Sequence, residues 1–496
     1  MSNPDNVLTS TLRVESEVGV LRRVLVCSPG EELRRVPPDQ RERYLVEDVL
    51  WLERAREQHR AFTDALDLLI RAAPGADAAV TPVVDLRAEL RKALTAQSGS
   101  PAASALVDEI AAIEPDLLPA DAEDLAASLR DELLRGESQL IDDLIAGVLV
   151  KRPRPGGSLF RVAPSPNVIF ARDYPIVLGG AAFLSSMAKQ VRRKEPALAR
   201  YLFREALGLG KACFDLEQMA FGPRAQRLLD AVPGRLCIEG GDVMALSRDT
   251  IVVGISERTS WKGATALALA LRKLKAERPA AFPFRELCAV EIPARRAMMH
   301  LDTVFTLVDH GLALAFPPLT FPNAREEMAV YACDLEGDAE APVEMRWVGP
   351  FSRAMGERLG SPGRPLTLIA GGGEVRTAQH REQWCDACNA FAVGPGVALS
   401  YARNDRTLAA LSALSGKALT VTPGISSPPK DHLRPFHVVA AAELDPARVK
   451  EWMASGERLM VAVDGSELGR ARGGPHCMTM ALHREERVGV GVGGGS

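Results

Sequence analysis

From residue 160 onward, short apolar segments alternate with glycine-rich turns, and this pattern restricts the folds that the chain can adopt. Short apolar runs bounded by glycine are typical of β-strands, and closely spaced pairs of such runs indicate hairpins. The segments are NVIFARD (167–173), CIEGGDVMALSRDTIVVG (237–254), HLDTVFTLVDHGLALAF (300–316), LTLIAGGG (366–373) and AFAVGPGVALSY (390–401). With occasional helices between them, they predict a mixed α/β fold with local hairpins rather than regular βαβ crossovers, which disfavours a doubly wound sheet.

The N-terminal part of the chain has a different texture. Residues 20–27, VLRRVLVC, precede the turn signal SPGEE and predict a first strand. Residues 44–73 carry apolar positions at three- and four-residue spacing, which predicts a long amphipathic helix. Between 87 and 150, a helical pattern rich in Ala, Leu, Asp and Glu is broken at Pro or Gly, and KRPRPGGS (151–158) has the composition of a linker.

The domain organisation follows from the length and from this change of texture. A chain of 496 residues exceeds what one hydrophobic core usually organises. We expect an α-helical bundle at 87–157, inserted into an α/β domain formed by residues 1–86 and 158–496. The tail at 488–496, VGVGVGGGS, predicts a last strand that runs into a flexible end.

Charge and cysteine usage exclude several classes of partner. Sixty basic residues against sixty-four acidic ones leave a formal charge of -4, so a nucleic-acid partner is not expected. The N-terminus has no basic region followed by an apolar run, and no stretch of about eighteen apolar residues occurs, which predicts a cytoplasmic protein without a membrane partner. The eight scattered cysteines indicate reduced thiols. Cys385 and Cys388 form CDAC, but nothing completes a zinc site, so packed side chains are the preferred interpretation.

Charged residues inside apolar strands mark candidate functional positions, because their burial is costly unless they are paired. Arg172 and Asp173 end one such segment, and Glu239 and Asp242 flank a glycine pair. His300 and Asp302 lie two residues apart, so on a strand they would share one face. A buried histidine with a structural partner is the alternative for this pair. A metal site is also conceivable, but no HxH, HExxH or third histidine stands at ligand spacing.

Cys477 in GGPHCMTM is a candidate nucleophile. Gly473 and Gly474 permit a turn that exposes the thiol, and Arg470 and Arg472 stand just upstream. Nearby cations lower a thiol pKa and make the sulfur more nucleophilic. The alternative is a buried, unreactive cysteine, which is common in protein cores.

Taken together and in order, six segments resemble the arginine deiminase family of guanidino-group-modifying enzymes. They are SEVGVLRRVLVCSPG (16–30), SPNVIFARD (165–173), IEGGDVMALSRDTIVVGISERTS (238–260), MHLDTVFT (299–306), REQWCDACNAFAVGPG (381–396) and RGGPHCMTM (472–480). The resemblance implies a five-bladed, pseudo-symmetric α/β propeller of ββαβ modules with an inserted helical bundle. It also implies hydrolysis of L-arginine to L-citrulline and ammonia through a covalent thiouronium intermediate, without cofactor or metal, in a homo-oligomer.

The resemblance assigns roles to individual residues. Cys477 would be the nucleophile and His300 the general acid and base, while Asp173 and Asp302 hold the guanidinium and Glu239 positions it. The substrate-binding set would comprise Asn167, Phe170, Arg192, Arg258 and Arg472, with Asp242 behind the residues that touch the substrate. The chemistry agrees, because carboxylates bind a planar guanidinium bidentately and its poorly electrophilic carbon requires a thiolate. The acids around the thiol would raise its pKa, so we expect the substrate cation itself to stabilise the thiolate.

Three alternatives share much of this pattern. An amidinotransferase would pass the intermediate to an amine, an arginine dihydrolase would release two ammonias, and a non-enzymatic arginine-binding protein would not need Cys477. The chain also carries extra sequence near 200–235, 265–285 and 330–365, which leaves the specificity among guanidino compounds open. We expect His476 to point away from the site, as the neighbour of Cys477 in an extended segment, and Trp384 to pack within the fold.

Overall fold

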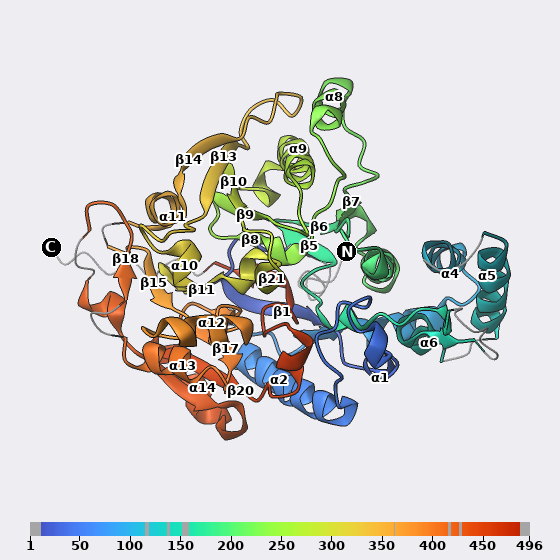
Figure 1. The fold of residues 1–496 in the computed structure, drawn as a ribbon, viewed down its shortest axis with the longest axis horizontal. Coiled ribbons are helices and arrows are strands. Elements are labelled where there is room, and N and C mark those ends of the chain that lie inside the picture. The colour runs from blue at the N-terminus through green and yellow to red at the C-terminus, as the bar shows by residue number, and fades with distance from the viewer. Residues whose placement is uncertain are drawn as a thin grey trace.

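The computed structural model describes residues 11–114, 119–135, 139–150, 158–361, 363–414, 418–425 and 429–486, and it shows a mixed α/β fold (Figure 1). Within these residues, five sheets repeat one pairing pattern: an antiparallel pair of strands, one of which also pairs in parallel with a third strand. The predicted hairpins are therefore present. In each sheet, one strand of the hairpin or antiparallel pair also pairs in parallel with a strand from a distant part of the chain. A local sequence pattern cannot reveal such a long-range pairing.

The two ends of the described chain meet in the first sheet. That sheet contains β1 (Val20–Val26), β2 (Val83–Asp85) and β21 (Met480–Glu485). The others contain β5 (Pro175–Leu178), β6 (Ala181–Leu184) and β7 (Cys213–Asp215); β8 (Val243–Ala245), β9 (Thr250–Ile255), β10 (Glu286–Glu291), β13 (Ala329–Asp334) and β14 (Arg346–Pro350); β11 (Phe305–Asp309), β12 (Leu312–Ala315), β15 (Thr367–Ala370) and β18 (Leu419–Thr420); and β16 (Phe391–Gly394), β17 (Val397–Tyr401), β19 (Phe436–Ala440) and β20 (Arg458–Val463).

Helices lie in the connections between these strands. The buried helix α9 (Trp261–Glu277) joins β9 to β10, its Ser260 accepting a hydrogen bond from the Gly263 N–H as an N-cap. The remaining helices of the α/β part are α1 (Glu31–Arg34), α2 (Leu52–Ala72), α7 (Lys194–Tyr201), α8 (Pro223–Ala231), α10 (Pro317–Thr320), α11 (Phe351–Leu359), α12 (Arg376–Trp384), α13 (Asp405–Ser412) and α14 (Pro446–Ser455). Within the described residues, no helix combines the length and the apolar character that crossing a bilayer requires.

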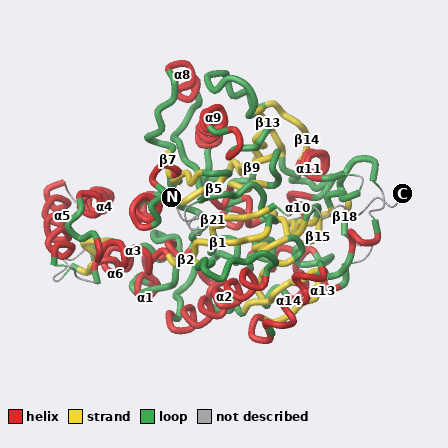
Figure 2. The backbone as a smooth tube through the Cα atoms, turned by 180° about the vertical axis from the view of Figure 1, so that it is seen from behind, coloured by secondary structure: helices red, strands yellow, loops and turns green. Residues whose placement is uncertain are grey.

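Four helices follow β2 in the region where the sequence predicts a bundle. They are α3 (Leu86–Ala96), α4 (Pro101–Ile113), α5 (Pro119–Leu134) and α6 (Leu140–Ala146), followed by a short hairpin of β3 (Val148–Leu149) and β4 (Phe160–Val162). Figures 1 and 2 show α4, α5 and α6 projecting from one side of the molecule. Asp85 and Ser100 cap α3 and α4, and Leu106, Val107 and Ile110 form part of a buried apolar stripe.

Three local expectations are corrected. The helix expected from residue 44 begins at Leu52, because residues 41–45 form turns in which Leu45 has a φ of 59°. The segment NVIFARD is no strand: Pro166–Ile169 form a 3-10 helix, and turns continue to Asp173. His300 precedes another 3-10 helix, Leu301–Thr303, so the strand rule for alternate residues does not govern its relation to Asp302. The tail at 488–496 lies outside the described residues.

Candidate active site

Cys477 lies in a turn immediately before β21, and three distant segments hold it there. Its N–H donates to Oδ1 of Asn389 over 3.0 Å, and its carbonyl accepts from the N–H of Arg172 over 3.0 Å. Its Sγ donates to Oδ2 of Asp302 over 3.5 Å. The thiol is 5% exposed, so it faces the protein interior rather than open solvent.

His300 faces two of the predicted acids. Its Nε2 is 2.9 Å from Oε2 of Glu239, and its Nδ1 is 3.6 Å from Oδ1 of Asp173. Burial lowers the pKa of His300, but Asp173, Glu239 and Asp242 outweigh it and raise the value to about 9. The imidazole is therefore positively charged at neutral pH and can donate a proton.

Asp242 holds the backbone beside His300. Its Oδ1 accepts the N–H of Leu301 over 2.9 Å, and its Oδ2 accepts the hydroxyl of Ser256 over 2.7 Å. Burial raises the pKa of Asp242 to about 7. This carboxyl group thus orients the segment that carries the imidazole, as expected for a residue behind the substrate-contacting groups.

Asp173 and Asp302 each have one committed oxygen and one open oxygen. Oδ2 of Asp173 accepts from Nη1 of Arg192 over 2.7 Å, and Oδ2 of Asp302 lies 2.9 Å from Nδ1 of His476. Oδ1 of Asp173 and Oδ1 of Asp302 are buried and have no hydrogen-bond partner within the described part of the chain. An unpartnered buried carboxylate oxygen is unfavourable, so each is poised to accept a ligand donor.

The glycine pair of EGGD allows the acids and the imidazole to approach closely. A Cβ on Gly241 would lie 2.6 Å from Nδ1 of His300 and 2.9 Å from Oδ1 of Asp173. A Cβ on Gly240 would lie 2.0 Å from the carbonyl oxygen of Arg172. All three distances are shorter than van der Waals contact allows, so a larger residue would collide with side chains at position 241 and with the backbone at position 240.

Arg192 and Arg258 lie among the acids. Arg192 donates to Asp173 and, over 2.7 Å, to Oε2 of Glu195, whereas Nη1 of Arg258 is 3.4 Å from Oε2 of Glu239. Burial raises the pKa of Glu239, but Arg258, the hydrogen bond to His300 and Arg192 lower it to about 2. Glu239 is therefore a carboxylate at every pH at which the protein is expected to work.

The other members of the predicted binding set lie around this cluster. Asn167 donates from Nδ2 to the carbonyl of Tyr44 over 2.7 Å. The ring of Phe170 lies against Gly473, where a Cβ would be 2.2 Å from the ring carbon Cε1. Arg472 has a φ of 65° and donates to the carbonyls of Trp384 and Ala297 over 2.9 and 3.1 Å. A positive φ angle is uncommon for arginine and marks a conformationally constrained position.

Two expectations about the neighbourhood of Cys477 are wrong. The local expectation that Arg470 and Arg472 lower the thiol pKa is wrong, because burial raises it well above the usual value. Asp302 and Asp173 raise it further, as predicted from the acids assigned to the site. Arg470 instead pairs with Asp48 over 2.8 Å. Trp384 is 44% exposed at the end of α12 rather than packed inside, with the Arg472 guanidinium 3.8 Å from its ring centroid.

Two residues that contact the site, His476 and Asn389, escaped the sequence reasoning. His476 does not point away, because residues 475–478 form a turn rather than an extended segment. Its Nδ1 meets Asp302 and its Nε2 lies 3.2 Å from Oε2 of Glu17. Asn389, inside the CDACNAF motif, bonds both the Cys477 N–H and, over 3.1 Å, the Asp302 carbonyl. Only its place directly after CDAC could have drawn attention to it.

The acids and the imidazole also have the composition of a metal site. One ligand atom from each of Asp173, Glu239 and His300 lies within 4.8 Å of the others. However, Arg192 approaches Asp173 at 2.7 Å and Glu239 at 3.6 Å. A cation placed on these carboxylates would face that guanidinium, so the arrangement is better suited to organic cations that share the acids with it.

The sequence matches a family model and named proteins over most of its length. A model of the family described as arginine deiminase matches residues 42–484. Proteins named arginine deiminase from Streptococcus uberis and Streptococcus pyogenes are each 28% identical, over 487 and 489 residues; both alignments cover 96% of this chain, and 99% and 98% of the relatives.

Two solved structures show weaker likeness. The N-terminal domain of ArgZ, an arginine dihydrolase, aligns with 14% identity and a TM-score of 0.41, covering 93% of this chain and 98% of that one. A dimethylarginine dimethylaminohydrolase adduct with 4-chloro-2-hydroxymethylpyridine aligns with 13% identity and a TM-score of 0.38, covering 93% and 99%.

Proposed function

The chain belongs to the arginine deiminase family, and from that membership we propose that it hydrolyses L-arginine to L-citrulline and ammonia through a thiouronium intermediate on Cys477. One observation carries the assignment of residues: Asp173 and Asp302, two of the acids that raise the pKa of the Cys477 thiol, each have a buried Oδ1 atom without a hydrogen-bond partner among the described residues. A guanidinium offers planar N–H donors to two such oxygens, and its carbon then lies beside the sulfur.

Binding prepares the nucleophile. The two carboxylates disfavour a thiolate on Cys477 while the site holds no substrate. A guanidinium between them neutralises their effect and stabilises the thiolate directly, so the thiol loses its proton as arginine binds. The substrate cation thereby activates its own nucleophile, and the reactive thiolate is formed only when there is something to attack.

The first half-reaction releases ammonia. The thiolate of Cys477 attacks the guanidinium carbon, and an S–C bond forms to give a tetrahedral adduct. His300, protonated because its pKa is about 9, donates its proton to one terminal nitrogen. The C–N bond breaks, ammonia leaves, and a thiouronium cation remains on the sulfur.

The second half-reaction regenerates the enzyme. Neutral His300 takes a proton from water, and the resulting hydroxide attacks the thiouronium carbon. The C–S bond breaks, the thiolate leaves, and the proton remaining on the ureido group of citrulline passes to solvent. Glu239, which is 2.9 Å from Nε2 of His300, stabilises the imidazolium before the first step and after the second.

Three arginines would hold the amino-acid end of the substrate. Arg258 is the best placed for the α-carboxylate, because its 3.4 Å contact with Glu239 is loose and can be exchanged for a closer oxygen. Arg192 is fully engaged with Asp173 and Glu195, so its first task is to orient Asp173. Arg472, stacked on Trp384, would close the side of the site next to Phe170.

The repeated sheets support the finer architecture. We propose that the five sheets with a common pairing pattern are the blades of a five-bladed, pseudo-symmetric propeller, and that residues 87–157 form an inserted helical unit. Strand β2 belongs to the first of these sheets, and α3 follows it directly in the chain. This order supports the position of the insertion. The homo-oligomer stays a prediction, which size-exclusion chromatography with light scattering tests.

Product stoichiometry tests the proposed reaction. The purified protein, incubated with arginine alone and without added metal, should release one ammonia for each citrulline. A dihydrolase would form ornithine and two ammonias, and an amidinotransferase would require an added amine. Cys477→Ser should abolish turnover and still bind arginine in a calorimetric titration, whereas ammonia release by this variant would refute the role of the thiol.

A further inference from the structure

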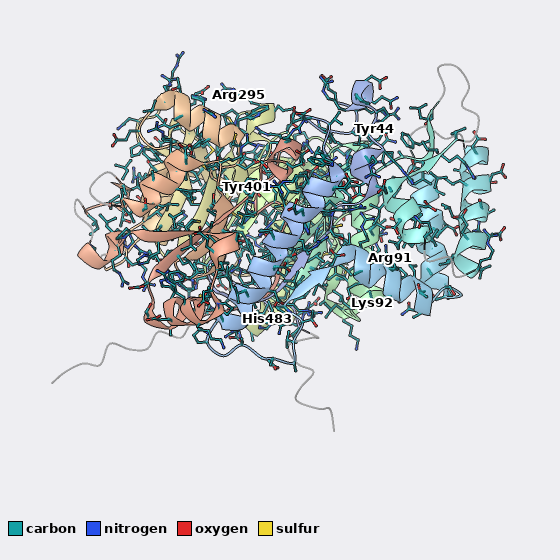
Figure 3. All side chains as sticks on the ribbon, turned by 90° about the horizontal axis from the view of Figure 1, so that it is seen from below. Tyr44, Arg91, Lys92, Arg295, Tyr401 and His483 are labelled. Atoms are coloured by element: carbon teal, nitrogen blue, oxygen red, sulfur yellow. The ribbon has the colours of Figure 1, made fainter. Side chains whose placement is uncertain are left out.

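A cavity of about 570 Å³, separate from the candidate active site, lies where the α/β part of the chain meets the helices that follow β2. Its lining comes from the loop after β1, from one face of α2, from the start of α3 and from the start of α6. In Figure 3, Arg91 marks this junction on α3, beside the blue helices. No residue of the candidate active site contributes to the lining.

Helix α2 presents a polar face to this cavity. Arg56, His59, Arg60 and Thr63 all line it, and their spacing of three and four residues places them on one side of the helix. The adjoining side of α2 packs into the core through Phe62, Leu66 and Leu69. His59 lies at the boundary between the two sides and contacts the ring of Phe62, whereas Arg56 and Arg60 lie outside the core.

The acids of the cavity are already committed. Both oxygens of Asp142 accept guanidinium donors, from Arg87 over 2.9 Å and from Arg91 over 2.8 Å. Asp85 accepts the backbone N–H groups of Ser28 and Ala88 over 2.8 and 2.9 Å. Glu31, the third carboxylate of the lining, pairs with Arg34 over 3.2 Å and with Arg56 over 3.4 Å. These carboxylates have little capacity left for a further donor, so the cavity is not built for a cation.

Of the four arginines in the lining, Arg87 is engaged with Glu32 and Asp142, whereas the other three have free donors. Within the described residues, the Arg60 side chain has no hydrogen-bond or ion-pair partner, and Arg91 has only Asp142. Arg56 makes two long contacts, 3.2 Å to the Pro29 carbonyl and 3.4 Å to Glu31. Each guanidinium carries five N–H donors, so most of the donor capacity of these three residues is available to a ligand.

A buried histidine lines the same cavity. His59 is 3% exposed, and its Nε2 has no hydrogen-bond partner among the described residues. Burial lowers the pKa of His59 to about 4, so the ring is neutral near pH 7. It can offer a hydrogen bond without adding charge.

We propose that this cavity binds a small phosphorylated molecule, whose phosphate is held by Arg56, Arg60 and Arg91. The three guanidinium groups come from two helices, and a tetrahedral phosphate has oxygens that can accept donors from several directions at once. A carboxylate is planar and is satisfied by one or two such groups. The bound phosphate connects α2 to α3, so ligand occupancy stabilises the junction between the two parts of the chain.

Binding to the full-length protein tests this site. Inorganic phosphate, pyrophosphate and ATP are titrated by calorimetry and by thermal unfolding, with citrate as a carboxylate probe and sodium chloride as an ionic-strength control. At least one phosphate probe should bind saturably and raise Tm. Arg60→Gln and Arg91→Gln should each weaken that binding by on the order of tenfold, the effect of losing a charge-assisted hydrogen bond.

Arg71→Gln is the matched control. Arg71 is also on α2, pairs with Asp67 over 2.7 Å and does not line the cavity, so its replacement should leave phosphate affinity unchanged. Hydrolysis of arginine in the absence of phosphate should be the same in Arg60→Gln and the wild type, which shows that the fold is intact. The proposal is overturned by saturable binding of citrate alone, by no binding of any phosphate probe, or by a phosphate affinity in both cavity variants that equals that of the wild type.

Discussion

The pKa of His300 provides the sharpest test of the proposed site, through Glu239→Gln. The folded protein raises the pKa of this imidazole from 6.5 to about 9. At 1.36 kcal/mol per pKa unit, this corresponds to about 3 kcal/mol of stabilisation of the charged ring. The 2.9 Å contact with Glu239 is one of the causes, and a hydrogen bond between charged groups contributes about 1.5–3 kcal/mol.

Glu239→Gln keeps the shape of the side chain and removes its charge. The pKa of His300 should therefore fall by about one to two units, toward about 7–8. Because His300 must be protonated to release ammonia, the alkaline limb of kcat/KM should move from near pH 9 to about pH 7–8 in the variant. Above that pH the variant should lose activity that the wild type keeps.

Two measurements check this result independently of each other. Citrulline formation gives the pH profile of kcat/KM, and NMR titration of the His300 ring in a Cys477→Ala background gives its pKa without turnover. Glu257→Gln is the control, because Glu257 bonds Arg258 over 3.0 Å but makes no described contact with His300. An alkaline limb and a ring titration that both stay near pH 9 in Glu239→Gln would refute the coupling.

Three further outcomes follow from the same contacts. Gly241→Ala should lower kcat by at least on the order of tenfold, because the new Cβ would lie 2.6 Å from Nδ1 of His300. Gly99→Ala is the control and should match the wild type, because a Cβ at that position meets nothing within 4 Å. Equal values of kcat in the two variants would contradict the close approach. His476→Leu removes the hydrogen bond that helps to lower the pKa of Asp302, so the acid limb of kcat/KM should move to higher pH, and an unmoved limb in a folded variant argues against it. Because the folded pKa of His300 is raised, its contribution to stability is complete below pH 6.5 and is lost toward pH 9; Tm should fall over that range, and less so in His300→Gln.

The sequence was most informative where the secondary structure is determined by neighbouring residues. The strand at 20–27, the hairpins and the helical region after β2 follow from periodicity and glycine placement, and the structure contains them. The parallel crossovers could not be read in this way, because they pair strands across long helical connections. The same limit explains His476: its direction depends on a turn between Pro475 and Met478, which a two-residue alternation cannot express.

Asp173 and Asp302 show how the fold keeps buried acids ready for a cation without neutralising them. Each is anchored through one oxygen by a permanent partner, Arg192 at 2.7 Å and His476 at 2.9 Å, and each leaves the other oxygen unsatisfied. The permanent partners fix the direction of the open oxygens before a ligand arrives. The unfavourable energy of two unpartnered oxygens is relieved by a ligand with donors for both, and a planar guanidinium holds its donors at fixed separations and directions, whereas an ammonium group is a compact charge without that fork geometry. Selectivity for the guanidinium over other cations therefore comes from the anchors as much as from the acids themselves.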